Sequence, residues 1–234
     1  MDEKWALQIA NTIFENIFGK PTNLTLEQIR ELFAFDEKLP KSVRDSVTGE
    51  ETWADSINGE FFITQKNMEE RDMKEGWLLP KREVSNLNDI LEIWKTVNYT
   101  TTERVYDSIN VAQSDTIYNC ENIFRSSDCR ECKNVVFSDS CTSCEYILAC
   151  SRSGSCTFGI RVDDSGSCTN SYNVTCSSKI SNSIFIQDCF NLNECMFCSH
   201  IANKNFCIAN MQFEEEEYYE IKRQIVDWIL SFSE

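Results

Sequence analysis

The sequence is poor in the residues that most catalytic and phosphate-binding sites require. Its 234 residues include one histidine, seven glycines and three prolines. The histidine, His200, falls at an outward position of the repeat described below, so no Ser-His-Asp set can be assembled around it. The glycines are widely scattered and form no phosphate-binding loop. We therefore expect no enzymatic activity and no cofactor.

Positive charge and long apolar runs are also scarce. Lysine and arginine number 22 against 38 aspartates and glutamates, which gives a formal net charge of −16. Such an acidic surface repels phosphate backbones, so we expect no nucleic-acid partner. No apolar run approaches the ~18 residues of a membrane span, and the first residues, MDEKWALQIANTIF, do not resemble a signal peptide. We expect no membrane association and a reducing, cytoplasmic location.

Cysteine, in contrast, is abundant and regularly spaced. Of the 13 cysteines, Cys120, Cys132, Cys144, Cys156 and Cys168 follow one another at intervals of twelve residues, and no cysteine precedes Cys120. When each block of twelve is numbered from such a cysteine, positions 1, 4, 7 and 10 hold small or apolar residues throughout. Self-similarity at a fixed period is the signature of repeat architectures.

A period of three residues matches neither a helix nor a strand. It fits a coil that turns inward at every third residue, with successive coils paired as in a parallel sheet. We therefore predict a β-solenoid over residues 108–211, and the spacing leaves open whether one coil takes twelve or twenty-four residues. The predicted solenoid core includes Cys120, Cys129, Cys132, Cys141, Cys144, Cys156, Cys168, Cys189, Cys195, Ile123, Val135 and Ile147.

The cysteines have three possible roles. The pattern C-x2-C-x8-C-x2-C that begins at Cys129 has the pair spacing of a zinc site. The same gaps arise if the cysteines occupy positions 10 and 1 of successive repeats. Buried free thiols behave as small apolar groups, so they need no metal. In a reducing cytosol bridges are uncommon, so ladders of free thiols without metal are favoured over zinc or disulfides. Cys176 alone is out of phase, and the best candidates for a bridge or a soft metal are Cys144, Cys150, Cys195 and Cys198.

Position 5 of the repeat forms a second apolar column. It lies next to an inward position and should therefore point outward, which predicts an apolar stripe along the solenoid. Such a stripe needs a cover, for which we consider the N-terminal domain, a second copy or a larger partner. We take it as the docking face for a protein partner, formed by Phe124, Val136, Leu148, Ile160, Tyr172, Ile184, Met196 and Ile208.

The two ends of the chain have helical patterns. Residues 1–95 form an α-rich N-terminal domain with helices expected over 3–18, 26–35 and 86–95, and residues 96–107 form a junction or first coil. An amphipathic helix over 214–232 is expected to cap the open end of the solenoid, as part of a C-terminal segment, 212–234. The predicted fold class is thus α+β.

Two resemblances follow from these patterns. The twelve-residue spacing resembles that of insect antifreeze solenoids, but the outward Thr-x-Thr ladder by which they bind ice is missing. The segment KNFCIANMQFEEEEYYEIKRQI, from 204 onward, is similar to the closing block of a family of cysteine-rich repeat proteins from metagenomic bacteria and tailed phages. That resemblance implies a repeat fold, and it favours a virion component.

We therefore expect a non-catalytic structural or interaction protein, such as a capsid-associated or minor structural component of a phage, with protein partners or further copies of itself. The alternative is a cytosolic thiol-based metal- or redox-buffering protein. The two hypotheses differ in one property, because a buffer must expose its thiols whereas a ladder must bury them.

Overall fold

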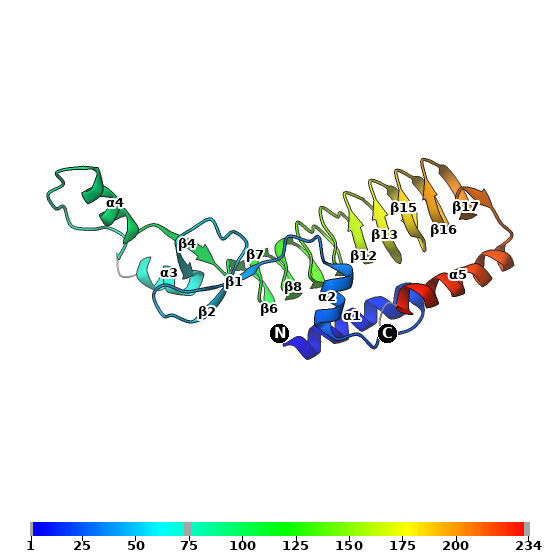
Figure 1. Cartoon of the computed structure of the whole chain (residues 1–234), viewed down its shortest axis with the longest axis horizontal. Helices are drawn as coiled ribbons and strands as arrows, with labels where there is room; N and C mark the ends of the chain where they lie inside the picture. Colours follow the sequence, from blue (N-terminus) through cyan, green and yellow to red (C-terminus); the bar gives the residue numbers. More distant parts are fainter. Residues whose placement is uncertain (1, 73–75, 232–234) are drawn as a thin grey trace.

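The computed structural model describes residues 2–72 and 76–231 of the chain. Figure 1 shows an elongated molecule. A stack of coils forms one end of the molecule, two helices lie along one side of that stack, and a smaller region of helices and strands forms the other end.

The stack is a parallel β-solenoid of about nine turns over residues 105–208, as the repeat predicts. Each strand pairs with the strand twelve residues further along the chain: Ile123 lies beside Val135, and Val135 lies beside Ile147. One coil therefore takes twelve residues. The strands of the stack are β5 (Val105–Tyr106), β6 (Ile109–Ala112), β7 (Asp115–Tyr118), β8 (Glu121–Phe124), β9 (Ser127–Arg130), β10 (Lys133–Val136), β11 (Tyr146–Leu148), β12 (Phe158–Asp163), β13 (Ser171–Thr175), β14 (Ser178–Ser181), β15 (Ile184–Gln187), β16 (Phe190–Ser199) and β17 (Ala202–Ile208).

Corners in the left-handed conformation produce the tight coil. Between residues 107 and 209 a positive φ recurs at nearly every third residue, at positions 3, 6, 9 and 12 of the repeat. Adopting this conformation costs a residue other than glycine roughly 1–2 kcal/mol of conformational free energy. Asparagine tolerates it best, and at position 3 the amide of Asn110 donates to Asn122, which donates to Asn134, at 2.9 and 3.0 Å.

The interior of the coil is narrow and is filled by small side chains. Inward serines have their hydrogen bonds satisfied by the backbone: Ser126 Oγ donates to the carbonyl of Phe124 and accepts from the N–H of Ser138, at 2.9 and 3.1 Å. Gly159 occupies an inward position, where an added Cβ would lie 3.0 Å from Val162 Cγ2. The bore therefore accepts a large side chain at one position of a coil only if a neighbouring position is small.

The first two helices pack against the solenoid. Helix α1 (Glu3–Phe18) contacts β8, β10, β11 and β12, and α2 (Leu26–Phe33) packs on α1 through an edge-to-face contact between Phe33 and Phe14. Asp2 caps α1, and Thr25 forms a capping box with Gln28.

A separate small region follows these helices. It contains the antiparallel pair β1 (Lys41–Arg44) and β2 (Glu51–Ala54), the parallel pair β3 (Phe61–Thr64) and β4 (Tyr99–Thr102), and the helices α3 (Gln65–Asp72) and α4 (Leu87–Lys95). Residues 1–95 thus do not form one separate domain. Their first part shares its apolar core with the solenoid, whereas the later part projects away from it (Figure 1).

The C-terminal segment also differs from the prediction. After β17 the chain turns back in a short antiparallel strand, β18 (Met211–Gln212), whose pairing covers the last coil. Helix α5 (Glu215–Ser231) then runs back along the side of the stack instead of across its end (Figure 1). Residue 232, the last one of the predicted helix, lies outside the described residues.

Candidate functional site

The thiol ladders lie inside the solenoid. All twelve predicted core residues are buried in one apolar cluster that follows the bore. Of the 13 free cysteines only Cys176 is exposed. The buried ones are Cys120, Cys129, Cys132, Cys141, Cys144, Cys150, Cys156, Cys168, Cys189, Cys195, Cys198 and Cys207.

The fully buried thiols of Cys141 and Cys150 behave as hydrogen-bond donors to the backbone rather than as nucleophiles, whereas hydrogen bonds with neighbouring cysteines lower the pKa of Cys120 and of Cys198 to about 7. Cys150 Sγ donates to the carbonyl of Leu148 at 3.4 Å, as serine does at the same position of other coils. Burial raises the pKa of Cys150 well above its ordinary value, and a hydrogen bond with Cys129 together with burial does the same for the pKa of Cys141. These two thiols stay protonated at neutral pH, and a thiol must lose its proton to attack a substrate or bind a metal.

The cysteines that were candidates for a bridge or a soft metal form no disulfide in the structure. Cys144, Cys150, Cys195 and Cys198 are all free and buried. Over residues 2–72 and 76–231 no three or more His, Cys, Asp or Glu side chains come together in an arrangement that could hold a metal ion. The zinc-like spacing at Cys129 is accounted for by the repeat columns.

The position-5 stripe is not available to a partner. Phe124, Val136, Leu148, Ile160, Tyr172, Ile184, Met196 and Ile208 are all buried, and they share one core with residues of α1, α2 and α5. Phe18 of α1 makes an edge-to-face contact with Tyr172, with ring centroids 5.4 Å apart. The prediction that the stripe docks a protein partner is therefore wrong, because the chain's own helices cover it.

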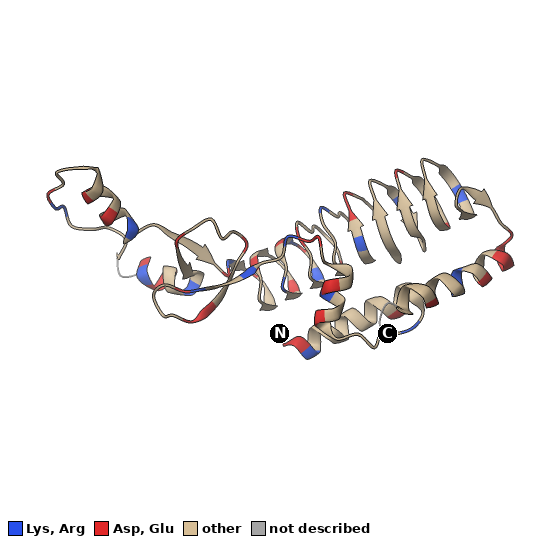
Figure 2. Ribbon diagram, viewed as in Figure 1, with Lys and Arg blue, Asp and Glu red and all other residues tan. Residues whose placement is uncertain are grey.

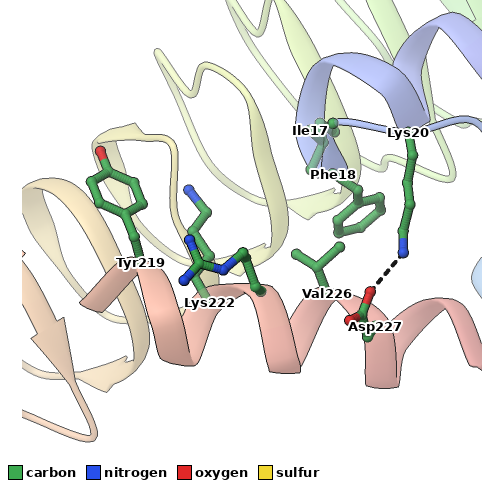
Figure 3. A pocket seen from close by; sticks show the side chains of 9 residues that line it. Ile17, Phe18, Lys20, Tyr219, Lys222, Val226 and Asp227 are labelled. Atoms are coloured by element: carbon green, nitrogen blue, oxygen red, sulfur yellow. Dashed lines mark hydrogen bonds and ion pairs between the residues drawn. The ribbon is translucent and has the colours of Figure 1, made fainter. Parts of the chain in front are cut away.

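The two covering helices meet over the middle of the stripe. Figure 3 shows Phe18 of α1 facing Val226 of α5, with an ion pair between Lys20 and Asp227 beside them; its Nζ–Oδ1 distance is 2.6 Å. An open cleft of about 490 Å³ separates the helices at this point. Lys222, on its wall, is paired with Glu194 at 2.7 Å. The cleft is thus the seam between two segments that jointly cover the solenoid.

The structure reveals an exposed apolar face on α4 that the sequence analysis missed. Leu87, Ile90, Leu91 and Trp94 recur at three and four residues and so lie on one side of the helix. Their exposed fractions are 66, 51, 40 and 53 %. Within the described part of the chain, no residue of α4 is buried. The periodicity is visible in the sequence, but it does not show whether the face is buried or exposed.

The remaining sequence candidates are exposed and isolated. His200 lies at a corner of the solenoid, with Nδ1 3.7 Å from an oxygen of Asp188, and its side chain is 74 % exposed. Cys176 also occupies a left-handed corner, with φ of 48°. Neither residue lies in a site with the partners that nucleophilic or general-base catalysis requires.

Charge is distributed unevenly along the molecule. Acidic side chains are dense at the start of α5 (Figure 2), where Glu215, Glu216 and Glu217 occupy the first turn and are favoured by the helix dipole. In the projecting region, residues 76–98 carry three basic side chains (Lys81, Arg82 and Lys95) and three acidic ones (Glu83, Asp89 and Glu92). The segment that contains α4 is therefore neutral in a strongly acidic protein.

Within the described residues, none of the helices is long and apolar enough to cross a membrane. Comparison of the chain with family models, with curated proteins and with solved structures finds no match.

Proposed function

We propose that this is a non-catalytic structural or interaction protein, in which a rigid solenoid carries an apolar contact surface on α4 at its far end. The observation that carries the proposal is the α4 face formed by Leu87, Ile90, Leu91 and Trp94. Four large apolar side chains on one exposed helix face are typical of an interaction site. Twelve buried thiols favour this function over a thiol buffer, which would need to expose them.

The helix presents its apolar face as a preformed element. The side chain of Asn86 accepts from the backbone N–H of Asp89, and the side chain of Asp89 accepts from the backbone N–H of Asn86, so both ends of a capping box are present. A capped helix does not need to order on binding, and this lowers the entropic cost of association. Helix-in-groove and helix-pair contacts are built from such i, i+3, i+4, i+7 anchors.

The occupant that we assign to this face is the α4 face of a second copy. Two chains that each carry a net charge of −16 repel one another over most of their surfaces. Residues 76–98 are neutral, so two copies can approach there. A helix face that is apolar along one stripe is self-complementary under two-fold symmetry, which is the commonest symmetry of homo-oligomers.

Analytical ultracentrifugation over a wide range of protein concentrations tests the proposal. We expect reversible dimerisation of the wild type and a monomer for Leu91→Asp, because an aspartate in the interface would be desolvated without a partner. The matched control is Ile109→Asp, which changes an equally apolar side chain, 61 % exposed, on the solenoid. The control should dimerise like the wild type. A wild type that stays monomeric, or a Leu91→Asp variant that still dimerises, would exclude the second copy as occupant.

The narrower expectation of a phage virion component remains part of the proposal. Its support is the similarity of the C-terminal block from Lys204 onward to the closing block of the repeat family. A virion role also agrees with the elongated shape, in which the solenoid holds the α4 face far from the last coil. Purified particles that lack the protein would count against it, and reproducible detection of the protein in such particles by mass spectrometry would support it.

A further inference from the structure

A second surface of the molecule combines unpaired positive charge with a half-open pocket. The pocket lies where α2, the connection from α2 to β1, the segment after β2 and a corner of the solenoid meet, and its volume is about 480 Å³. This is within the usual range of small-molecule sites, roughly 300–1,000 Å³. It is lined by Arg30, Ala34, Phe35, Glu37, Lys38, Leu39, Pro40, Lys41, Asp55, Ser56, Ile57, Asn58 and Arg125.

We propose that this pocket binds a small organic anion, whose phosphate or carboxylate group is held by Arg125 and whose apolar body lies against Leu39, Pro40 and Ile57. The proposal is independent of the α4 contact surface.

Arg125 is the central observation. Its Nε is buried and has no hydrogen-bond partner, and within the described residues no carboxylate lies within ion-pair distance of its guanidinium. Burial and the neighbouring Arg30 lower the pKa of Arg125, because both disfavour its charged form. The guanidinium is held at the corner after β8, 5.2 Å above the ring of Trp53. A partly buried cation of this kind is normally paired, and a bound anion would supply the missing partner.

The other charges of the pocket leave it cationic. Arg30 is occupied by Glu27, and Lys38 lies 3.4 Å from Asp55. Lys41 is a further cation on the wall. The remaining carboxylate is Glu37, whose pKa is raised to about 7 by burial and by Asp36. At neutral pH the Glu37 carboxyl is therefore uncharged in part of the molecules. In a protein of net charge −16, the lining of this pocket, with four cations and two acids, carries a local excess of positive charge.

The apolar part of the wall indicates an organic anion rather than a bare ion. Leu39 and Pro40 cover one side of the pocket, and Ile57, 48 % exposed, stands at its rim. Phe35 is 68 % exposed at the same rim, and the guanidinium of Arg161 lies 4.5 Å from its ring. Ligand sites typically combine such apolar walls with a few charged groups that fix orientation.

Isothermal titration calorimetry with three probes tests the site. Phenyl phosphate carries the anionic group and the apolar body, inorganic phosphate carries only the first, and phenol only the second. We expect saturable 1:1 binding of phenyl phosphate, weaker binding of inorganic phosphate and none of phenol. Benzoate in a fourth titration decides between the two head groups, since the tighter of benzoate and phenyl phosphate identifies the preferred one.

Arg125→Gln should weaken phenyl phosphate binding at least tenfold. Lys41→Gln, a change at an exposed side chain, should weaken it by a smaller factor, and it keeps the test valid if Arg125→Gln fails to fold. The matched control is Arg152→Gln, because Arg152 lies at another corner of the solenoid and is paired with Asp163 at 3.3 Å; it should bind like the wild type. No saturable binding to the wild type, or an equal loss in Arg125→Gln and Arg152→Gln, would overturn the proposal.

Discussion

The solenoid and the projecting region around α4 place similar apolar faces in opposite environments. The position-5 stripe of the solenoid is covered along its whole length by α1 and α5, and Leu148 in its middle has no exposed area. The face of α4 is equally apolar, yet Leu91 is 40 % exposed and Leu87 66 %. The described part of the chain supplies a cover for the first face and none for the second. An apolar column therefore does not reveal by itself whether it is a core or a contact surface; that depends on segments far away in the sequence.

The largest effect is expected from a charge in the covered face. Leu148→Asp would place an unpaired carboxylate between the solenoid and α1, and we expect it to lower the free energy of unfolding by more than about 4 kcal/mol. Leu91→Asp, the same change on α4, should lower it by no more than about 1 kcal/mol in dilute protein, because 40 % of the side chain is already exposed to water. Urea unfolding followed by circular dichroism measures both. Similar losses in the two variants would remove the contrast between the faces.

The interior of the solenoid can be compared with its exterior in the same way. Gly159→Val adds a side chain that points into the bore toward Val162, and overpacking of this kind costs about 1–3 kcal/mol. Gly154→Val, five residues earlier, adds the same side chain where nothing lies within 4 Å, so its cost should stay below about 0.5 kcal/mol. Thermal unfolding distinguishes the two variants. A tolerated Gly159→Val would mean that the bore is wider than the structure shows.

Glu37 lies where the connection between the two regions crosses the solenoid, and it makes the stability depend on pH. Its pKa is raised to about 7 by burial and by Asp36, above the value of about 4.3 in an unfolded chain. The folded state therefore binds more protons between pH 4.3 and 7, and stability falls as pH rises through that window. Glu37→Gln should be neutral at pH 4 and should stabilise the protein at pH 8 by about 1 kcal/mol, because solvent screens the partly exposed group. Unfolding midpoints of both proteins at the two pH values test the sign, and a pH-independent difference would contradict it.

The smallest effect is expected at the seam between the two covering helices. The pair between Lys20 and Asp227 is exposed, with side chains 47 and 70 % accessible, and exposed pairs of this kind contribute about 0.2–1 kcal/mol. A double-mutant cycle with Lys20→Met and Asp227→Asn should give a coupling energy in that range and should lose it in high salt. A coupling of several kcal/mol would show that this pair, and not the apolar contact, holds α1 and α5 over the stripe.

The bore of the solenoid was predictable because each inward position is defined by the repeat alone. A period of three with Cys, Ser, Val and Ile at fixed positions places Ile123, Val135 and Ile147 in one inward column. The structure then shows that one coil takes twelve residues, so that Ile123 lies beside Val135 and Val135 beside Ile147. Asparagine at position 3 is compatible with a left-handed corner. The same conformation at positions 6, 9 and 12 could not be predicted, because residues such as Phe137 and Phe185 rarely adopt it in isolation.

The cover of the stripe was not predictable from local patterns. The amphipathic stripes of α1 and α5 show that each helix buries a face, but a stripe does not specify which surface it packs against. Contacts such as Phe18 with Tyr172 join residues more than 150 positions apart. For the same reason, the exposure of α4 could not be inferred from its periodicity. The unpaired Arg125 depends on the same long-range arrangement, since its pocket is formed by three separate segments of the chain, residues 30–41, 55–58 and 125.

The central claim is that the cysteines are buried free thiols of a structural ladder, and counting reactive thiols tests it most directly. The native protein is treated with iodoacetamide under conditions where an exposed thiol reacts fully, and its intact mass is compared with that of protein alkylated after unfolding. We expect one modification in the native state, at Cys176, and 13 after unfolding, in agreement with 12 buried free thiols. Rapid modification of most cysteines in the native protein, or pairs of cysteines that remain unmodified after unfolding without reductant, would contradict the ladder and would favour a thiol buffer or a disulfide framework.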